Sequence, residues 1–206
     1  MVAIVDYGVG NLFSLCSSFA AIGAEAVVTN DAMVLKSASH VLLPGVGAFE
    51  DARLRLSRSG LEDTLRELVS NGTPLMGVCL GMQLLFDESL EFGVHKGLGF
   101  IPGRVIGMQG TIDESLLIPH IGWNGLQKTQ DHPLLSGIED GDCVYFVHSF
   151  FASECDESVI ATTEYGVQMT AAVARGNVLG CQFHPEKSGE VGLKILKNFV
   201  NFGERA

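Results

Sequence analysis

The sequence predicts an α/β protein: a single domain with a mostly parallel open sheet, flanked by helices and extended by antiparallel strands. In the first half of the chain, short apolar runs alternate with helical periodicity, and strands separated by such helices form parallel βαβ units. Between residues 103 and 174, the strand-like runs are separated only by Gly or polar turns, which indicates an antiparallel or mixed extension. The 206 residues contain no linker or repeat, so we expect one domain spanning 1–206.

The first half supplies four strands and three helical segments, each bounded by turn residues. The predicted strands are Val2–Val5, Ala26–Thr29, His40–Leu43 and Leu75–Val78. The predicted helices are Leu12–Ile22, a stretch that carries Leu61, Leu65 and Leu68, and Leu80–Phe86. Asn11 is suited to cap the first helix and Gly23 to end it.

The second half is predicted to consist mainly of strands. They are Arg104–Ile106, Val144–Val147, Val159–Thr162, Thr170–Val173 and Val178–Phe183. A C-terminal helix should follow, because Val191, Ile195, Phe199 and Phe202 recur on one helical face.

Composition excludes several classes of function. The net charge of -11 argues against nucleic acid as a partner, since phosphate binding needs a basic face, and it disfavours an anionic membrane. We see no signal peptide and no apolar run of the ~18 residues that a membrane span needs. The five cysteines show neither CxxC nor zinc-finger spacing, which predicts reduced, mostly buried thiols, a cytoplasmic location and no metal. No phosphate loop or complete dinucleotide fingerprint occurs, so no cofactor is expected.

Gly77-Val78-Cys79-Leu80-Gly81 has the form of a nucleophile elbow with Cys in place of Ser. Such a turn presents the nucleophile between a strand and a helix, and the glycines allow the chain to turn without side-chain clashes. The backbone N–H of Leu80 would then point at a developing oxyanion. A buried cysteine in a Gly-rich strand end is an equally good interpretation of the pentapeptide alone.

His184 is the best candidate for a base that activates this thiol. It follows a predicted strand and should therefore lie at the same edge of the sheet as Cys79. Pro185 favours an extended segment, which would place Glu186 on the same face as His184. A loop histidine beside a solvated glutamate is the alternative, and the presence of the cysteine elbow favours the catalytic interpretation.

Pro44-Gly45-Val46-Gly47 ends the third strand. Its glycines free the backbone to aim N–H groups at an anion or a tetrahedral oxygen. An ordinary βα turn would look the same.

These motifs together resemble the class I (triad) glutamine amidotransferases in order, spacing and chain length. Further motifs resemble one family among them, the glutaminase subunits of imidazole glycerol phosphate synthases. The motifs are Asp6-Tyr7-Gly8-Val9-Gly10-Asn11-Leu12, Pro119-His120-Ile121-Gly122-Trp123-Asn124, Tyr145-Phe146-Val147-His148-Ser149 and His184-Pro185-Glu186-Lys187-Ser188.

The resemblance implies a flavodoxin-like fold and a covalent mechanism. Cys79 would attack the carboxamide carbon of L-glutamine, His184 would carry the proton, and Glu186 would orient His184. Further implied roles are an oxyanion hole from the backbone of Leu80, Val46 and Gly47, and glutamine binding by Gln83, Ser149 and Phe150.

The resemblance also implies a partner. The ammonia would cross to a (β/α)8-barrel cyclase subunit, which makes imidazole glycerol phosphate and an aminoimidazole carboxamide ribotide in histidine biosynthesis. Trp123, Lys187 and Asn11 are the candidate interface residues. The alternatives are a core position for Trp123 and a solvated surface position for Lys187.

Three other functions stay open at this point. The chain could serve another amidotransferase of the superfamily, act alone as a cysteine hydrolase on γ-glutamyl compounds, or bind without catalysis. The Pro-His-Ile-Gly-Trp-Asn and His-Pro-Glu-Lys-Ser motifs favour the histidine pathway, and the intact Cys, His and Glu set favours an enzyme.

Overall fold

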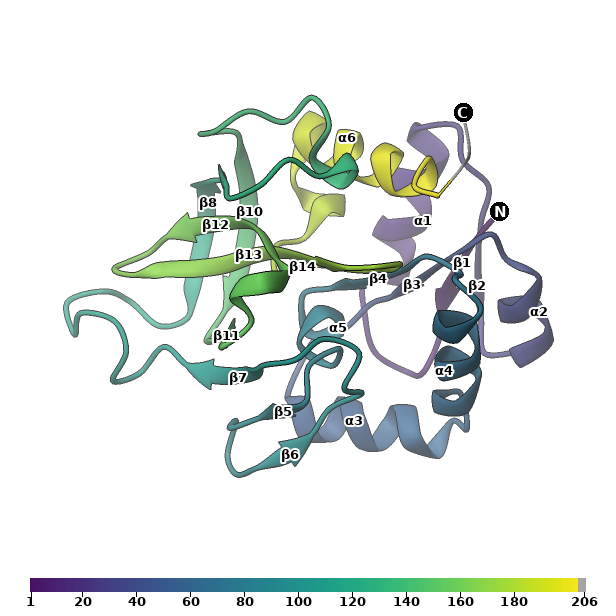
Figure 1. Cartoon of the computed structure of the whole chain (residues 1–206), viewed down its shortest axis with the longest axis horizontal. Coiled ribbons are helices and arrows are strands. Elements are labelled where there is room, and N and C mark those ends of the chain that lie inside the picture. Colours follow the sequence, from purple (N-terminus) through teal and green to yellow (C-terminus); the bar gives the residue numbers. More distant parts are fainter. Residues whose placement is uncertain (204–206) are drawn as a thin grey trace.

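A central eight-stranded sheet organises the molecule (Figure 1). The structure is a computed structural model that describes residues 1–203. From edge to edge, the strands are β2 (Ala26–Thr29), β1 (Val2–Val5), β3 (His40–Leu43), β4 (Leu75–Val78), β14 (Val178–Cys181), β13 (Gln168–Arg175), β12 (Val159–Glu164) and β9 (Gln127–Lys128). The first five run parallel and the last three are antiparallel, which confirms the predicted mostly parallel sheet with an antiparallel extension.

Two smaller sheets contain the other strands of the second half. One pairs β8 (His120–Gly125) with β10 (Cys143–His148). The other has the order β11 (Phe150–Ser153), β7 (Arg104–Gly107), β5 (Glu88–Ser89) and β6 (His95–Lys96). Expecting Arg104–Ile106 and Val144–Val147 to extend the main sheet was therefore wrong. The chain changes sheets at Ser149, between β10 and β11, and no periodicity in the sequence marks that change.

Six α-helices and three 3₁₀ turns lie within residues 1–203. The helices are α1 (Leu12–Ala21), α2 (Ala32–Ser37), α3 (Phe49–Arg58), α4 (Glu62–Ser70), α5 (Leu80–Gln83) and α6 (Gly189–Val200). The 3₁₀ turns are η1 (Pro133–Leu135), η2 (Asp156–Ser158) and η3 (Pro185–Lys187). The predicted cap is confirmed, because the Asn11 side chain accepts a hydrogen bond from the Ser14 N–H. The sequence did not predict α2.

The helix predicted over Leu80–Phe86 is much shorter, since α5 ends at Gln83. Residues 84–86 turn away because the following loop captures their carbonyl oxygens. The N–H of Leu98 donates to Leu84, that of Phe100 to Leu85 and that of Gly99 to Phe86. Long-range hydrogen bonds thus replace the helical ones that the apolar spacing predicted.

The sheet separates two apolar cores, because alternate strand residues face opposite sides. Val2 and Ile4 pack in one core with α1 and α6, whereas Ala3 and Val5 face α2, α3 and α4. Figure 1 shows these two helix groups on opposite sides of the sheet. Within residues 1–203, none of the helices combines the length and apolar character that a membrane span requires.

Candidate active site

Cys79 lies at the carboxyl end of β4, where it forms the N-cap of α5. Its φ of 54° is in the left-handed region, which costs a non-glycine residue energy and is typical of a nucleophile turn. Only glycine fits at the two flanking positions, because a Cβ there would overlap backbone atoms. A Cβ on Gly77 would lie 2.6 Å from the Gly81 carbonyl oxygen, and one on Gly81 would overlap the Leu43 carbonyl. The elbow predicted from the pentapeptide is therefore present.

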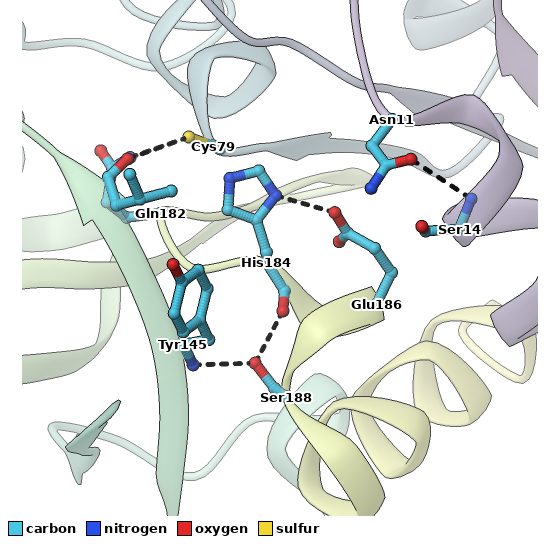
Figure 2. Close-up of polar contacts among 9 residues, drawn as sticks. Asn11, Ser14, Cys79, Tyr145, Gln182, His184, Glu186 and Ser188 are labelled. Carbon is cyan, nitrogen blue, oxygen red and sulfur yellow. Dashed lines mark hydrogen bonds and ion pairs between the residues drawn. The ribbon is translucent and has the colours of Figure 1, made fainter. Parts of the chain in front are cut away.

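His184 and Glu186 lie beside this elbow. The His184 Nδ1 is 2.8 Å from the Glu186 Oε1, and their side chains are only 4% and 1% exposed. The other ring nitrogen faces the Cys79 sulfur (Figure 2). Cys79 and His184 therefore meet at one edge of the sheet, as predicted.

The segment that carries His184 and Glu186 is not extended as predicted. Pro185–Lys187 forms one 3₁₀ turn, η3, with Pro185 at its start. This turn brings Glu186 back to the His184 ring. The Ser188 hydroxyl fixes the turn, because it donates to the His184 carbonyl at 2.6 Å and accepts from the Tyr145 N–H at 2.9 Å (Figure 2).

The His184 ring is held in its charged form. Burial alone lowers the pKa of His184, but hydrogen bonds to Cys79 and Glu186 outweigh it and raise the pKa to about 9. The site therefore favours the imidazolium form of His184.

The loop after β3 packs directly against the elbow. A Cβ on Gly45 would lie 2.6 Å from the Gly81 nitrogen, so only glycine permits this approach. The buried Tyr7 hydroxyl donates to the Pro44 carbonyl at 2.6 Å and anchors the loop. Val46 and Gly47 then line the same cleft as Cys79, and Gly47 has a φ of +96°. An anion-binding backbone at this loop remains a prediction.

A cleft of about 490 Å³ opens over the sulfur. Of the residues singled out from the sequence, the structure gathers around it Val46, Gly47, Cys79, Leu80, Gln83, Ser149, Phe150, His184 and Lys187. Glu186 lies behind His184 and does not line the cleft, nor do Asn11 and Trp123.

Gln83 is tied into the protein more tightly than the sequence suggested. Its Nε2 donates to the Phe150 carbonyl at 3.0 Å and to the Gln182 Oε1 at 2.9 Å. Since both amide protons are used, a contact with substrate is left to its Oε1. Gln182, which the sequence analysis passed over, in turn donates to the Cys79 sulfur at 3.7 Å (Figure 2).

Glu91 is a second residue that the sequence analysis missed. It lies between β5 and β6, lines the cleft and is largely buried. Its Oε2 accepts from the Phe49 N–H at 2.7 Å, which fixes the carboxylate. The neighbouring Phe92 also lines the cleft, and its ring makes a T-shaped contact with that of Phe150. No motif marks Glu91, and the only signal is an acid between two large apolar residues. A fixed carboxylate in the cleft can bind a cationic group of a substrate.

The three interface candidates differ in their surroundings. Trp123 is 54% exposed on β8 and makes a T-shaped ring contact with Tyr145, so its alternative interpretation as a core residue is wrong. The Lys187 Nζ lies 5.6 Å from the centre of the Tyr145 ring, at the cleft wall. Asn11 caps α1, and its side chain accepts from the Ser14 N–H (Figure 2). An interface at these residues remains a prediction.

The cysteines outside the elbow are free thiols. Cys155 and Cys181 are buried, as is Cys79, whereas Cys143 is exposed and Cys16 is half-buried, so most of the five thiols are buried as expected. Within residues 1–203, no group of three or more His, Cys, Asp or Glu side chains is placed to hold a metal ion.

Comparison with known families agrees with this geometry. The family model described as glutamine amidotransferase class-I matches residues 3–202. A relative from Geobacillus kaustophilus, named imidazole glycerol phosphate synthase subunit HisH, is 49% identical over 203 residues, covering 97% of this chain and 96% of the relative. A relative of the same name from Archaeoglobus fulgidus is 46% identical over 206 residues, covering 100% of both chains.

Solved structures share the fold at low sequence identity. A structure described as a glutamine amidotransferase matches with a TM-score of 0.75 at 20% identity, covering 97% of this chain and 100% of the other. The structure of PurLQS from Thermotoga maritima matches with a TM-score of 0.73 at 20% identity, covering 98% of both chains.

Proposed function

The chain belongs to the class I glutamine amidotransferases and, within them, to the HisH subunits of imidazole glycerol phosphate synthase, and on this premise we propose how its residues act. The family's function is that of a glutaminase in histidine biosynthesis. We infer that Cys79, His184 and Glu186 hydrolyse glutamine, and that the ammonia passes to a cyclase subunit. The observation that carries this proposal is the open cleft over a cysteine elbow whose sulfur faces a glutamate-bound histidine.

The first half-reaction forms a thioester. The Cys79 sulfur attacks the carboxamide carbon of glutamine, and the thiol proton resides on His184. The oxyanion binds the Leu80 N–H and the backbone at Val46 and Gly47. The C–N bond then breaks, and His184 gives its proton to the departing nitrogen, which leaves as ammonia.

The second half-reaction restores the thiol. His184 takes a proton from water, whose oxygen attacks the thioester carbon. The C–S bond breaks, glutamate leaves, and the proton returns to the sulfur. Throughout, Glu186 accepts the hydrogen bond from His184 Nδ1 at 2.8 Å, which keeps the other nitrogen directed at sulfur or water.

The cleft also suits the amino-acid end of glutamine. The fixed Glu91 carboxylate is placed to bind the α-ammonium group by charge attraction. Ser149 and Phe150 line the cleft and offer backbone groups to the α-carboxylate.

The surface beside the cleft supports a protein partner. Exposed apolar side chains gather along β8 and the segment before it, namely Leu117, Ile118, Ile121 and Trp123. Pro119, from the same segment, lines the cleft, so this surface reaches the site where ammonia forms. A cyclase docked here would receive ammonia before bulk water protonates it. The free cysteines fit a reducing compartment, and we include a cytoplasmic location in the proposal.

The test separates the two active sites of the complex. Cys79→Ala in the assembled complex should lower glutamine-dependent synthesis by at least about 10³-fold and leave ammonia-dependent synthesis within about twofold of wild type. Cys143→Ala, at an exposed thiol, is the matched control and should change neither rate.

Two outcomes would contradict the proposal. Loss of both activities in a correctly assembled Cys79→Ala complex would overturn the separation of glutaminase and cyclase. Glutamate release that is equally fast without any partner would instead indicate a free-standing hydrolase.

A further inference from the structure

Two buried histidines outside the proposed triad are hydrogen-bonded to each other. His120 begins β8 and His148 ends β10, and the antiparallel register pairs them directly. The His120 Nδ1 is 3.1 Å from the His148 Nε2, and the two residues are only 2% and 6% exposed. His148 lines the cleft, whereas His120 does not.

The second contact of His148 fixes the direction of this hydrogen bond. Its Nδ1 is 2.9 Å from the Phe150 carbonyl oxygen, which can only accept, so Nδ1 carries the proton. Burial lowers the pKa of His148 to about 4 and also lowers the pKa of His120, so both rings are neutral near pH 7. The His148 Nε2 therefore accepts, and the His120 Nδ1 donates to it.

His148 is therefore unavailable as a general base, because both of its nitrogens are engaged. The remaining role for His148 is to fix the position of the Phe150 carbonyl through its Nδ1–H hydrogen bond. That oxygen also accepts from the Gln83 Nε2 at 3.0 Å, so both of its lone pairs are used. The peptide after Phe150 is fixed from two sides.

Pairing with β7 shows where the Phe150 N–H points. The Ser149 carbonyl accepts from the Met108 N–H at 2.9 Å, and Phe150 lies opposite Gly107, the next position along the ladder. Hydrogen-bonded and non-hydrogen-bonded pairs alternate in an antiparallel ladder, so the N–H and C=O of Phe150 both turn away from β7. The carbonyl reaches Gln83 and His148 at the cleft wall, and the N–H faces the same side.

We propose that His120 is a positioning residue for glutamine, which acts through His148 to hold the Phe150 carbonyl and thereby aims the Phe150 N–H at the α-carboxylate of the substrate. This inference rests on the proposed glutaminase function. The His120 ring is itself fixed by stacking, at 4.0 Å from Tyr165 and 5.1 Å from Phe146 between ring centres. Stacking and hydrogen bonding can therefore be removed separately.

Two substitutions in the complex with the cyclase subunit separate them. His120→Phe keeps an aromatic ring for stacking and removes the donor, whereas His120→Asn keeps a donor near the Nδ1 position and removes the stack. We expect His120→Phe to raise KM for glutamine about tenfold, the effect of one lost buried hydrogen bond, with kcat within about threefold. His120→Asn should keep KM closer to wild type, and ammonia-dependent synthesis should not change in either variant.

A spectroscopic readout tests the same hydrogen bonds without catalysis. In ¹⁵N NMR spectra, His148 should be the Nδ1–H tautomer in the wild type and should gain the Nε2–H form in His120→Phe. Wild-type KM in His120→Phe, or equal KM increases in both variants together with equal losses of thermal stability, would overturn the inference. If the wild-type complex itself releases no glutamate, the proposed function fails, whereas failure of the inference alone leaves wild-type glutaminase intact.

Discussion

At the scale of single residues, the charge on His184 decides the chemistry of the cleft. The ring is buried, which disfavours a cation, yet its contacts with Cys79 and Glu186 raise its pKa to about 9. Because this pKa lies above the unfolded value of 6.5, the contacts stabilise the fold fully below pH 6.5, and this contribution is lost as the pH rises through 9. In the proposed mechanism, the leaving nitrogen receives this proton.

Replacing the carboxylate should move this titration. Glu186→Gln removes the negative charge beside His184, so we expect the alkaline limb of the kcat/KM profile to shift from about pH 9 to a lower pH. We also expect kcat to fall by about 10²-fold or more, since the ring loses its orienting acceptor. Steady-state glutaminase assays from pH 6 to 10 measure both effects. Glu190→Gln, at an exposed acid on α6, is the control. An unmoved alkaline limb in Glu186→Gln would assign that limb to another group.

Lowering the pH should reduce the stability of the fold through the buried histidine pair. His148 has a folded pKa of about 4 against an unfolded 6.5, so the unfolded chain binds more protons in that interval and stability falls as the pH drops from 6.5 to 4. The full shift corresponds to on the order of 3 kcal/mol. Urea unfolding at several pH values should show that this slope shrinks in His148→Phe, whatever the variant's stability at pH 7. An unchanged slope would mean that other groups cause the acid sensitivity.

The Cys79–His184–Glu186 arrangement could be predicted because each member carries a local signature next to a strand end. The roles of Glu91, Gln182 and His120 could not, although His120 lies in a motif that resembles the family. Each acquires its place through tertiary contacts: Glu91 through the Phe49 N–H, Gln182 through Gln83, and His120 through His148. Local motifs mark residues at strained or tightly packed turns. They do not reveal a role that depends on side-chain contacts with distant segments.

At the scale of elements, the turn from β4 to α5 and the loop after β3 form one packed unit. Gly45 and Gly81 leave no room for side chains where the two segments meet, and Gly77 leaves none inside the turn itself. The glycine pattern made this unit predictable. Local periodicity failed at residues 84–86, where another segment supplied the hydrogen bonds. The extended segment predicted from Pro185 failed because the proline begins a 3₁₀ turn.

This packing predicts a large difference between two glycine substitutions. Gly81→Ala would place a Cβ against the Leu43 carbonyl, so we expect it to destabilise the fold by more than about 3 kcal/mol and to abolish glutaminase activity. Gly60→Ala, after α3, also has a positive φ but meets no atom within 4 Å, and it should cost only about 1 kcal/mol. Chemical denaturation measures both. Similar costs in the two variants would show that the elbow region relaxes.

At the scale of the whole molecule, the parallel half of the sheet was predictable and the division of the second half into sheets was not. Each parallel strand is bounded by turn residues and is followed by a helix or turn that the sequence also marks. By contrast, tertiary contacts determine the pairing of β7, β8, β10 and β11. Strands β10 and β11 belong to different sheets although only Ser149 separates them. The apolar surface along β8 is the result of that arrangement.

The single tryptophan should report on the proposed interface. Trp123 is the only Trp in the chain and is half-exposed, so docking of the cyclase subunit should shift its emission to shorter wavelength. Trp123→Ala should weaken the complex by about tenfold or more, because exposed aromatics are frequent hot spots, and should leave thermal stability nearly unchanged. Met33→Ala, at an exposed apolar residue on α2, is the control. Equal affinities for both variants in titration calorimetry would place the interface elsewhere.

The order of the strands in the central sheet has a consequence for biosynthesis of the protein. Cys79 follows β4 and His184 follows β14, and these strands are neighbours in the sheet although they are far apart in the sequence. During translation, the elbow leaves the ribosome long before His184, the proposed base. If the proposed triad is correct, a growing chain that lacks His184 should not hydrolyse glutamine or release ammonia. On the proposed mechanism, glutaminase activity requires β14 to be paired with β4, and we therefore expect it to appear only after the whole sheet has folded.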